Sequence, residues 1–282
     1  MTKDKIPLRR LGGDKRAVSP AISTVILTSA VVVLLLVTVT FANNFLNARM
    51  AENEFSAMKQ FMQTVGLQID DVSWTIGRTQ TIRYASKYGR VNFESIALNY
   101  TICIYKTDDS WKNYSYTAGM ILFNMPIDMY TLGNNYHERV FPSSDGSFLQ
   151  VGTSAPISHV FLVEKLPMPD GNYIRIIVAP TMRMLNATIN SVNYFKFYLP
   201  CLVQGQHPHY SQSVTITGEN VYVRTESEVN KVKITVEFPN EDLGFDSEFF
   251  KFDGIEVEIS GLNGSVVEFY SSEVKVSLGL HV

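Results

Sequence analysis

The side chains that could take part in catalysis or metal binding are few and scattered along the chain. His207 and His209 lie on either side of a proline, and the residues around them supply no third ligand. A zinc site needs three or four ligands, so we expect this pair to belong to an ordinary loop. The acidic residues within 242–253 lack the glycine and glutamate spacing of a calcium loop. We therefore expect no bound metal.

Local catalytic motifs are also missing from the sequence. It contains no Cys-x-x-Cys pair, no His-Glu-x-x-His, no Gly-x-Ser-x-Gly and no glycine-rich phosphate or dinucleotide loop. The five histidines do not combine with the carboxylates into an acid–base or nucleophilic arrangement. We therefore predict that the protein is not an enzyme and has no cofactor.

The two cysteines, Cys103 and Cys201, both lie in apolar, strand-like stretches. In an oxidising exterior they could form one disulfide, which would stabilise the fold by at most about 4–5 kcal/mol through loop closure. The alternative is two buried thiols that behave as small hydrophobic groups. The sequence leaves both alternatives open.

Asparagines in the Asn-x-Ser/Thr pattern could carry glycans if this part of the chain lies outside the cell. Composition alone would produce about as many such patterns by chance, so only an exterior location favours glycosylation. The four candidates are Asn99, Asn113, Asn186 and Asn263.

The composition is that of a membrane segment joined to a folded body. The chain has 282 residues, of which 45% are hydrophobic and 18% charged, and its net charge is −3. The first 17 residues carry six basic and two acidic side chains, so the rest of the chain is acidic. An acidic body argues against nucleic-acid binding. A basic flank before an apolar helix predicts a cytoplasmic N-terminus and an extracellular body.

The dominant feature of the sequence is an uncharged stretch from Ala17 to Ala48. A helix needs roughly 20 apolar residues to cross a bilayer, and this stretch is longer. It is apolar on every face, so we expect a helix that lies in lipid or among other apolar helices. Ser19 can cap it and Pro20 suits its first turn. Its apolar contact residues include Pro20, Ile22, Val25, Val32, Leu35 and Val39.

Small hydroxyl residues inside the same stretch have two interpretations. They can let helices approach closely and form hydrogen bonds between them. They can equally bond back to the preceding turn of their own helix. The sequence leaves this open for Ser23, Thr24, Thr28, Ser29, Thr38 and Thr40.

Residues 1–17 are interpreted as a leader peptide rather than as part of a fold. No convincing cleavage site follows the apolar stretch, whereas Lys15-Arg16-Ala17 directly precedes it, so cleavage would make Val18 the first mature residue. Gly12-Gly13 is a second site, which would leave three charged residues on the mature chain.

The sequence from Arg16 to Ile22, followed by a β-branched apolar stretch, resembles the start of archaeal type IV pilin precursors. The resemblance implies that a prepilin peptidase recognises Arg16 and Ala17 and releases Val18 as the new N-terminus. It also implies that assembly machinery draws the helix from membrane lipid into a filament core. Bacterial pilins have a glutamate at the position of Ile22, so the likeness is to the archaeal pattern. It covers about 30 residues at the start of the chain.

The helix is expected to continue to about Ile76, with Gly77 as its stop, over roughly 85 Å at about 1.5 Å per residue. Gly66 and Asn43-Asn44 are positions where it could bend. Beyond Arg49 it becomes amphipathic, which predicts that this half packs on the body. The apolar stripe consists of Phe55, Met58, Met62, Val65, Ile69, Val72 and Ile76.

From residue 78 onward the apolar residues no longer recur every three or four positions, as in a helix, but every second position, as in a strand. Alternation is clearest in residues 231–238, 255–260 and 274–280. Asn263-Gly264 predicts a hairpin between 255–260 and 266–270. We expect a β-rich, sandwich-like head over 78–282, which residues 204–209 could divide in two. Further strands are expected near 92–105, 112–118, 158–164, 172–179, 193–202, 212–217 and 220–225.

The sequence thus predicts an α+β protein with a leader at 1–17, an apolar helix with an amphipathic extension at 18–77 and a head at 78–282. The favoured function is a structural subunit of a type IV pilus-like surface filament used for attachment. A filament needs a head-to-tail contact that does not close, and identical apolar helices can supply one. The alternatives are a lone membrane-anchored binding protein for a sugar or peptide, and an uncleaved signal-anchored ectodomain.

Overall fold

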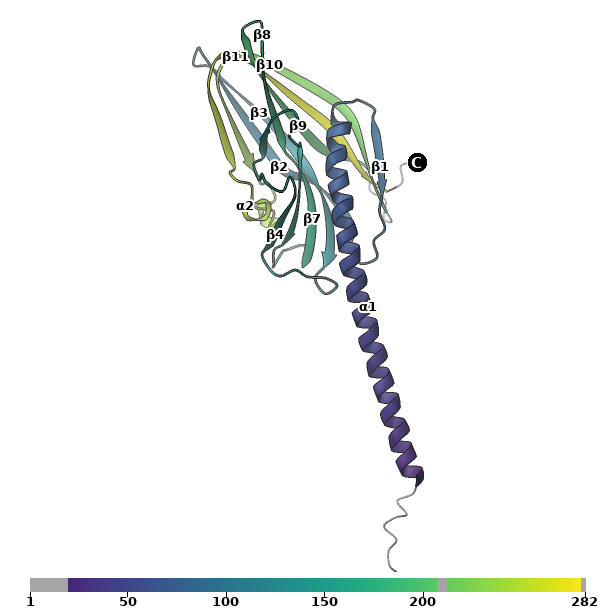
Figure 1. Cartoon of the computed structure of the whole chain (residues 1–282). Coiled ribbons are helices and arrows are strands. Elements are labelled where there is room, and N and C mark those ends of the chain that lie inside the picture. The colour runs from purple at the N-terminus through teal and green to yellow at the C-terminus, as the bar shows by residue number, and fades with distance from the viewer. Residues whose placement is uncertain (1–19, 207–211, 280–282) are drawn as a thin grey trace, which may run out of the picture. The chain divides into compact units, whose positions relative to one another are not determined.

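The computed structural model describes residues 20–206 and 212–279, which form a long N-terminal helix followed by a β-rich region (Figure 1). This confirms the expected α+β class. Helix α1 extends from Pro20 to Ser73 without interruption. The chain divides into two compact units between Arg49 and Met50, so the last part of α1 belongs to the same unit as the sheet.

The C-terminal part of α1 is buried along the predicted stripe. Ala51 is 0% exposed and Phe55 3%, and the stripe continues in contact with the sheet (Figure 1). This confirms that the amphipathic half packs on its own domain. Ile76 is the exception, because α1 ends at Ser73 and leaves it 66% exposed in the following turn. The buried stripe residues are Phe55, Met58, Met62, Val65, Ile69 and Val72.

Gly66, expected as a place to bend, instead lets α1 approach the sheet closely. A Cβ at Gly66 would lie 2.8 Å from Val160 Cγ2 and 3.2 Å from Ser158 Oγ. The Ser158 hydroxyl donates a 2.7 Å hydrogen bond to the Gly66 carbonyl oxygen. The glycine therefore serves helix–sheet packing.

Besides α1, the described residues form eleven strands and two short helical segments. The strands are β1 (Thr79–Arg83), β2 (Arg90–Lys106), β3 (Trp111–Pro126), β4 (Tyr136–Phe141), β5 (Leu149–Val151), β6 (Ser158–Glu164), β7 (Tyr173–Pro180), β8 (Met182–Ile189), β9 (Val192–Gln204), β10 (Ser213–Glu237) and β11 (Glu256–Leu278). A 3-10 turn, η1 (Glu241–Leu243), and a short helix, α2 (Ser247–Phe250), lie between β10 and β11.

All eleven strands belong to one hydrogen-bonded sheet, with the order β4-β6-β7-β3-β2-β10-β11-β9-β8-β5 and β1 beside β10. The ladders are antiparallel except for β11 with β9 and β5 with β8. The strands are therefore connected by one continuous path, and the region after α1 is rich in β-structure as expected.

The two faces of the sheet bury two separate cores. On β3, Leu122 belongs to one core and its neighbours Ile121 and Phe123 to the other, as the alternation of a strand requires. The larger core includes Tyr100, Ile102, Ile104, Leu122, Phe161, Ile177, Phe197, Cys201 and Phe269. The helix-side core includes the α1 stripe together with Ile121, Phe123, Ile176, Val178, Val214 and Val276.

The hairpin predicted at Asn263-Gly264 is wrong. Lys231 of β10 is paired with Ser260 and Val229 with Ser265, so residues on both sides of this dipeptide belong to β11. Asn263 (φ 50°) and Gly264 (φ 76°) have the left-handed conformation that favours such a turn. They use it in a bulge within one long strand, because β10 continues as a partner on both sides.

The division of the head near residues 204–209 is not found. The described residues from Met50 onward form one compact unit, in which β9 and β10 lie on either side of that segment in the same sheet. His207 and His209 lie outside the described residues.

Candidate functional site

The N-terminal part of α1 exposes an apolar surface on all sides. Every residue from Ile22 to Met50 is exposed, including the predicted contact residues Val25 (62%), Val32 (54%) and Leu35 (59%). Ile22 (50%) and Val39 (55%) are exposed to a similar degree. Pro20 begins the helix as predicted, whereas Arg16, Ala17 and Val18 lie outside the described residues.

Hydroxyl groups on this part of α1 are satisfied within the helix itself. Thr28 donates to the carbonyl oxygen of Thr24 at 2.8 Å, and Thr38 donates to that of Leu34 at 2.7 Å. Thr40, two residues further along, donates in the same way to the carbonyl oxygen of Leu36 at 2.8 Å. Bonding back to the preceding turn is thus confirmed for these three, and their methyl-bearing side chains leave no donor unpaired in an apolar medium.

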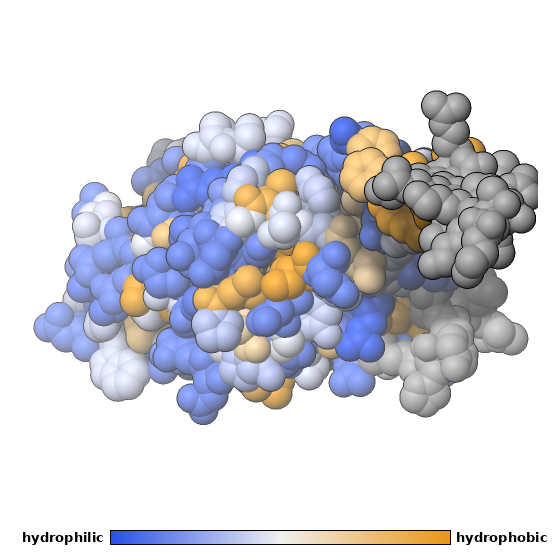
Figure 2. All heavy atoms as spheres, turned by 90° about the horizontal axis from the view of Figure 1, so that it is seen from below, coloured by the Kyte–Doolittle hydropathy of each residue, from blue (hydrophilic) through white to orange (hydrophobic). Residues whose placement is uncertain are grey.

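The exposed part of α1 is long and apolar enough to cross a membrane. Arg49 lies close to its end, and the guanidinium carbon of this arginine is 5.4 Å from the centre of the Phe45 ring. An arginine beside an aromatic ring suits the boundary between hydrocarbon and water. By contrast, the face of the molecule seen from below in Figure 2 is mainly hydrophilic and carries only small groups of apolar side chains. The helix surface is therefore the part of the described chain best suited to lipid or to another apolar helix.

The two cysteines are free thiols, so the disulfide alternative is not what the structure contains. Cys201 belongs to the larger core. Cys103 lies between Ile102 and Ile104, which both face that core, so its side chain points to the opposite face of the sheet. Burial raises the pKa of Cys201 to about 12, which makes its thiol unreactive.

The four candidate glycosylation asparagines lie in different settings. The Asn99 amide nitrogen donates to Glu237 at 3.2 Å and its oxygen accepts from Ser115 at 2.8 Å, so this side chain is engaged across β2, β3 and β10. Asn113 on β3 and Asn186 on β8 are exposed. Asn263 is exposed in the β11 bulge rather than at a hairpin tip.

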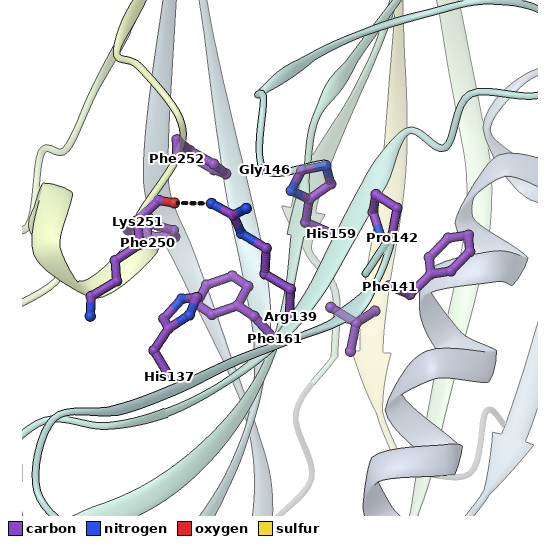
Figure 3. A pocket seen from close by; sticks show the side chains of 11 residues that line it. His137, Arg139, Phe141, Pro142, Gly146, His159, Phe161, Phe250, Lys251 and Phe252 are labelled. Carbon is purple, nitrogen blue, oxygen red and sulfur yellow. Dashed lines mark hydrogen bonds between the residues drawn. The ribbon is translucent and has the colours of Figure 1, made fainter. Parts of the chain in front are cut away.

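A small hollow lined by both aromatic and polar side chains lies where β4 and β6 meet the end of α2 and the residues after it (Figure 3). His137 and His159 lie on either side of Arg139, which donates a 3.2 Å hydrogen bond to the Lys251 carbonyl oxygen and pairs with Asp253. The hollow is about 10 Å³, which is room for a water molecule rather than a substrate.

Both of these histidines are neutral near neutral pH. Burial lowers the pKa of His137 to about 4, and the nearby Lys251 and Arg139 charges act in the same direction. Burial also lowers the pKa of His159 to about 4. No local pattern in the sequence pointed to this cluster, because its members come from three separate segments. Within the described ranges, no three His, Cys, Asp or Glu side chains gather to hold a metal ion.

Comparison of the chain with protein families, with curated proteins and with solved structures found no match.

Proposed function

We propose that the protein is a subunit of a type IV pilin-like surface filament of the archaeal kind. The observation that carries the proposal is the helix from Ile22 to Met50, which is exposed on every side and carries no charge between Arg16 and Arg49. Such a surface needs an apolar environment, because leaving it in water is costly per unit area. Membrane lipid supplies this before assembly, and helices of identical subunits supply it afterwards.

The exchange of lipid for protein is energetically feasible because both surroundings are apolar. Hydrophobic burial changes little, so close packing between helices decides the outcome. The internal bonds of Thr28, Thr38 and Thr40 help, since these hydroxyls need no new partner in either state. The C-terminal part of the same helix belongs to the head, so each subunit would be tied covalently and by packing to the filament core.

In this proposal the N-terminus starts in the cytoplasm and a prepilin peptidase removes residues 1–17. The head lies outside the cell, where it forms the filament surface and makes attachment contacts. We also propose that the continuous sheet folds over its larger core in the manner of a sandwich, since strands as distant in the order as β6 and β9 contribute to that core.

The first test is the intact mass and N-terminal sequence of the native protein from the cell surface. A chain that begins at Val18, together with filaments by electron microscopy, is the expected result. A chain that retains residues 1–17 contradicts the proposal. Processing without filaments would indicate a lone membrane-anchored binding protein instead.

The second test places a charge in the exposed helix. Val32→Lys costs about 2.5–3.5 kcal/mol in an apolar medium, so we expect filaments to be lost while the protein still fractionates with membranes. Leu35→Lys should behave in the same way. The control is Ser56→Lys, at an exposed position further along the same helix. Normal filaments from Val32→Lys would contradict assembly through this surface.

A further inference from the structure

The middle of β10 is paired with only one strand. On one side it is paired with β11. On the other side, β1 pairs only as far as Thr217 and β2 begins at Val229. Within residues 20–206 and 212–279, no strand covers the interval from Gly218 to Glu228 on that side. Register shifts between Gly218 and Asn220 and between Glu226 and Val229 lie near the two ends of this interval.

The missing partner leaves an open hollow of about 320 Å³ beside β10. The volume lies within the range of small-ligand sites. It is bounded by Ser115, Tyr116 and Thr117 of β3, Cys201 and Val203 of β9, Tyr222 and Arg224 of β10, and Ser271, Ser272 and Glu273 of β11. Because the Ser115 and Thr117 hydroxyls both donate to Asn99, these two residues are engaged elsewhere.

The polar side chains of the hollow combine donors and acceptors. Tyr222 is 50% exposed, and its hydroxyl donates to Glu273 Oε2 at 3.4 Å. The same carboxylate oxygen accepts from Asn220 at 2.7 Å. Arg224 is exposed, with its guanidinium carbon 5.0 Å from the centre of the Tyr114 ring.

Tyr116 adds a buried hydroxyl at the base of the hollow. Its oxygen is buried and makes no hydrogen bond of normal geometry within the described residues, although Arg224 and Ser271 lie beside it. Buried polar groups are nearly always hydrogen-bonded. The exposed Arg224 side chain lies beside this oxygen, so a ligand oxygen could reach the hydroxyl only if Arg224 moved aside.

The charges decide the class of ligand. Arg224 and Glu273 carry opposite charges, so the lining has no net charge that would attract an ion of one sign. A hydroxyl group donates and accepts at once, which matches a mixed lining of this kind. The C–H faces of a sugar ring also pack well against tyrosine rings.

We propose that this hollow between β3, β9, β10 and β11 binds a neutral sugar unit, with Tyr222, Arg224 and Glu273 as its contacting side chains. The site lies wholly within the β-rich head, so it would serve a filament subunit and a lone surface protein equally. Its test is therefore independent of assembly.

The experiment uses the full-length protein in a polyoxyethylene detergent, because detergents with sugar headgroups would compete. Saturation-transfer NMR with glucose, galactose, mannose and N-acetylglucosamine should detect at least one of them at about 10 mM, and titration gives its affinity. Tyr222→Ala and Glu273→Gln should each weaken that binding about tenfold or more. Trp111→Ala, which removes an aromatic side chain that is 64% exposed elsewhere, is the control and should leave binding unchanged.

Glucuronate is tested alongside the four neutral sugars, and three results would overturn the proposal. The first is the absence of signal from all four neutral sugars while circular dichroism shows a folded protein. The second is binding that survives both Tyr222→Ala and Glu273→Gln. The third is binding that appears only with the anionic sugar glucuronate.

Discussion

Glu54 on α1 accepts a 2.6 Å hydrogen bond from the Ser86 hydroxyl, 32 residues further along the chain. The same carboxylate accepts from the backbone N–H groups of Lys87 at 2.8 Å, Tyr88 at 3.0 Å and Gly89 at 3.1 Å. One acidic side chain therefore fixes the loop between β1 and β2 onto the helix.

Glu54→Gln should lower the free energy of unfolding by about 1 kcal/mol, after allowance for the partial exposure of this side chain. Burial acts to raise the pKa of Glu54, but the hydrogen bonds outweigh it and the pKa is lowered from 4.5. The contribution is thus present above about pH 4.5 and is lost as the pH falls through the lowered value. Denaturant titrations at neutral and acid pH check this. The exposed Glu241→Gln is the control, and an equal loss at both pH values would contradict the prediction.

Gly66→Ala should destabilise the protein although alanine favours helices by about 1 kcal/mol. The added methyl would meet the buried Val160 side chain at 2.8 Å, and overpacking of this kind costs about 1–3 kcal/mol. Thermal unfolding of Gly66→Ala, Val160→Ala and the double variant measures the coupling. We expect the double variant to be more stable than the sum of the single losses predicts. Strict additivity would show that the methyl finds room.

Glu226→Gln should cost about 2 kcal/mol, because a hydrogen-bonded charge is removed from a nearly buried position. Its carboxylate accepts from Lys112 and Tyr114, both at 2.6 Å, and pairs with Lys106 at 2.9 Å. Burial acts to raise its pKa, but these partners prevail and lower the pKa to about 2. The contribution of Glu226 to stability should thus be lost as the pH falls from about 4.5 to about 2. Glu228→Gln, at an exposed neighbour, should leave the unfolding curve unchanged. A loss no larger than that of this control would refute the prediction.

His137 and His159 should make stability rise with pH. Their pKa is about 4 when folded, against 6.5 as the ordinary value, so the unfolded chain binds more protons between these limits. Each should contribute a slope of up to about 1.4 kcal/mol per pH unit in that window. Unfolding free energies measured from pH 4 to 7 on the wild type and on His137→Asn/His159→Asn test this. Equal slopes in the two proteins would show that the histidines are not the cause.

Maleimide labelling of the folded protein should modify Cys103 and spare Cys201. Cys103 is partly exposed, whereas Cys201 is 8% exposed with a pKa of about 12. Intact mass should show one label, and none after Cys103→Ala, until denaturant is added. Two labels in the folded state, or a disulfide under non-reducing conditions, would contradict the structure.

The spacing of the apolar residues and the residue types at turns predicted much of the fold. The apolar stripe from Phe55 to Val72 is buried as expected, because helical spacing alone places those side chains on one face. Asn263 and Gly264 have the left-handed conformation that their residue types favour. Their hairpin was wrong because the sequence does not reveal which strand continues beside them, and here β10 does so over the whole length of β11.

Of the two candidate sites, the sequence predicted the exposed helix but not the hollow, because strand pairing cannot be read from the sequence. The exposed helix could be located because it is one contiguous stretch with a single property. The hollow beside Tyr222 could not, since it depends on where the pairing of β1 and β2 with β10 stops. Gly66 was identified only as a position where the helix could bend, because sequence alone does not show that Val160 lies opposite it.

The burial of the α1 stripe also determines where this protein can be cut or recombined. Removing the chain before Gly77 would take seven buried core side chains from the head, so a protease that acts there would destroy the head rather than release it. A chimera that exchanges heads between different anchors should instead be joined near Arg49 and Met50. Residues 50–73, although continuous with the apolar helix, would have to be inherited together with the sheet.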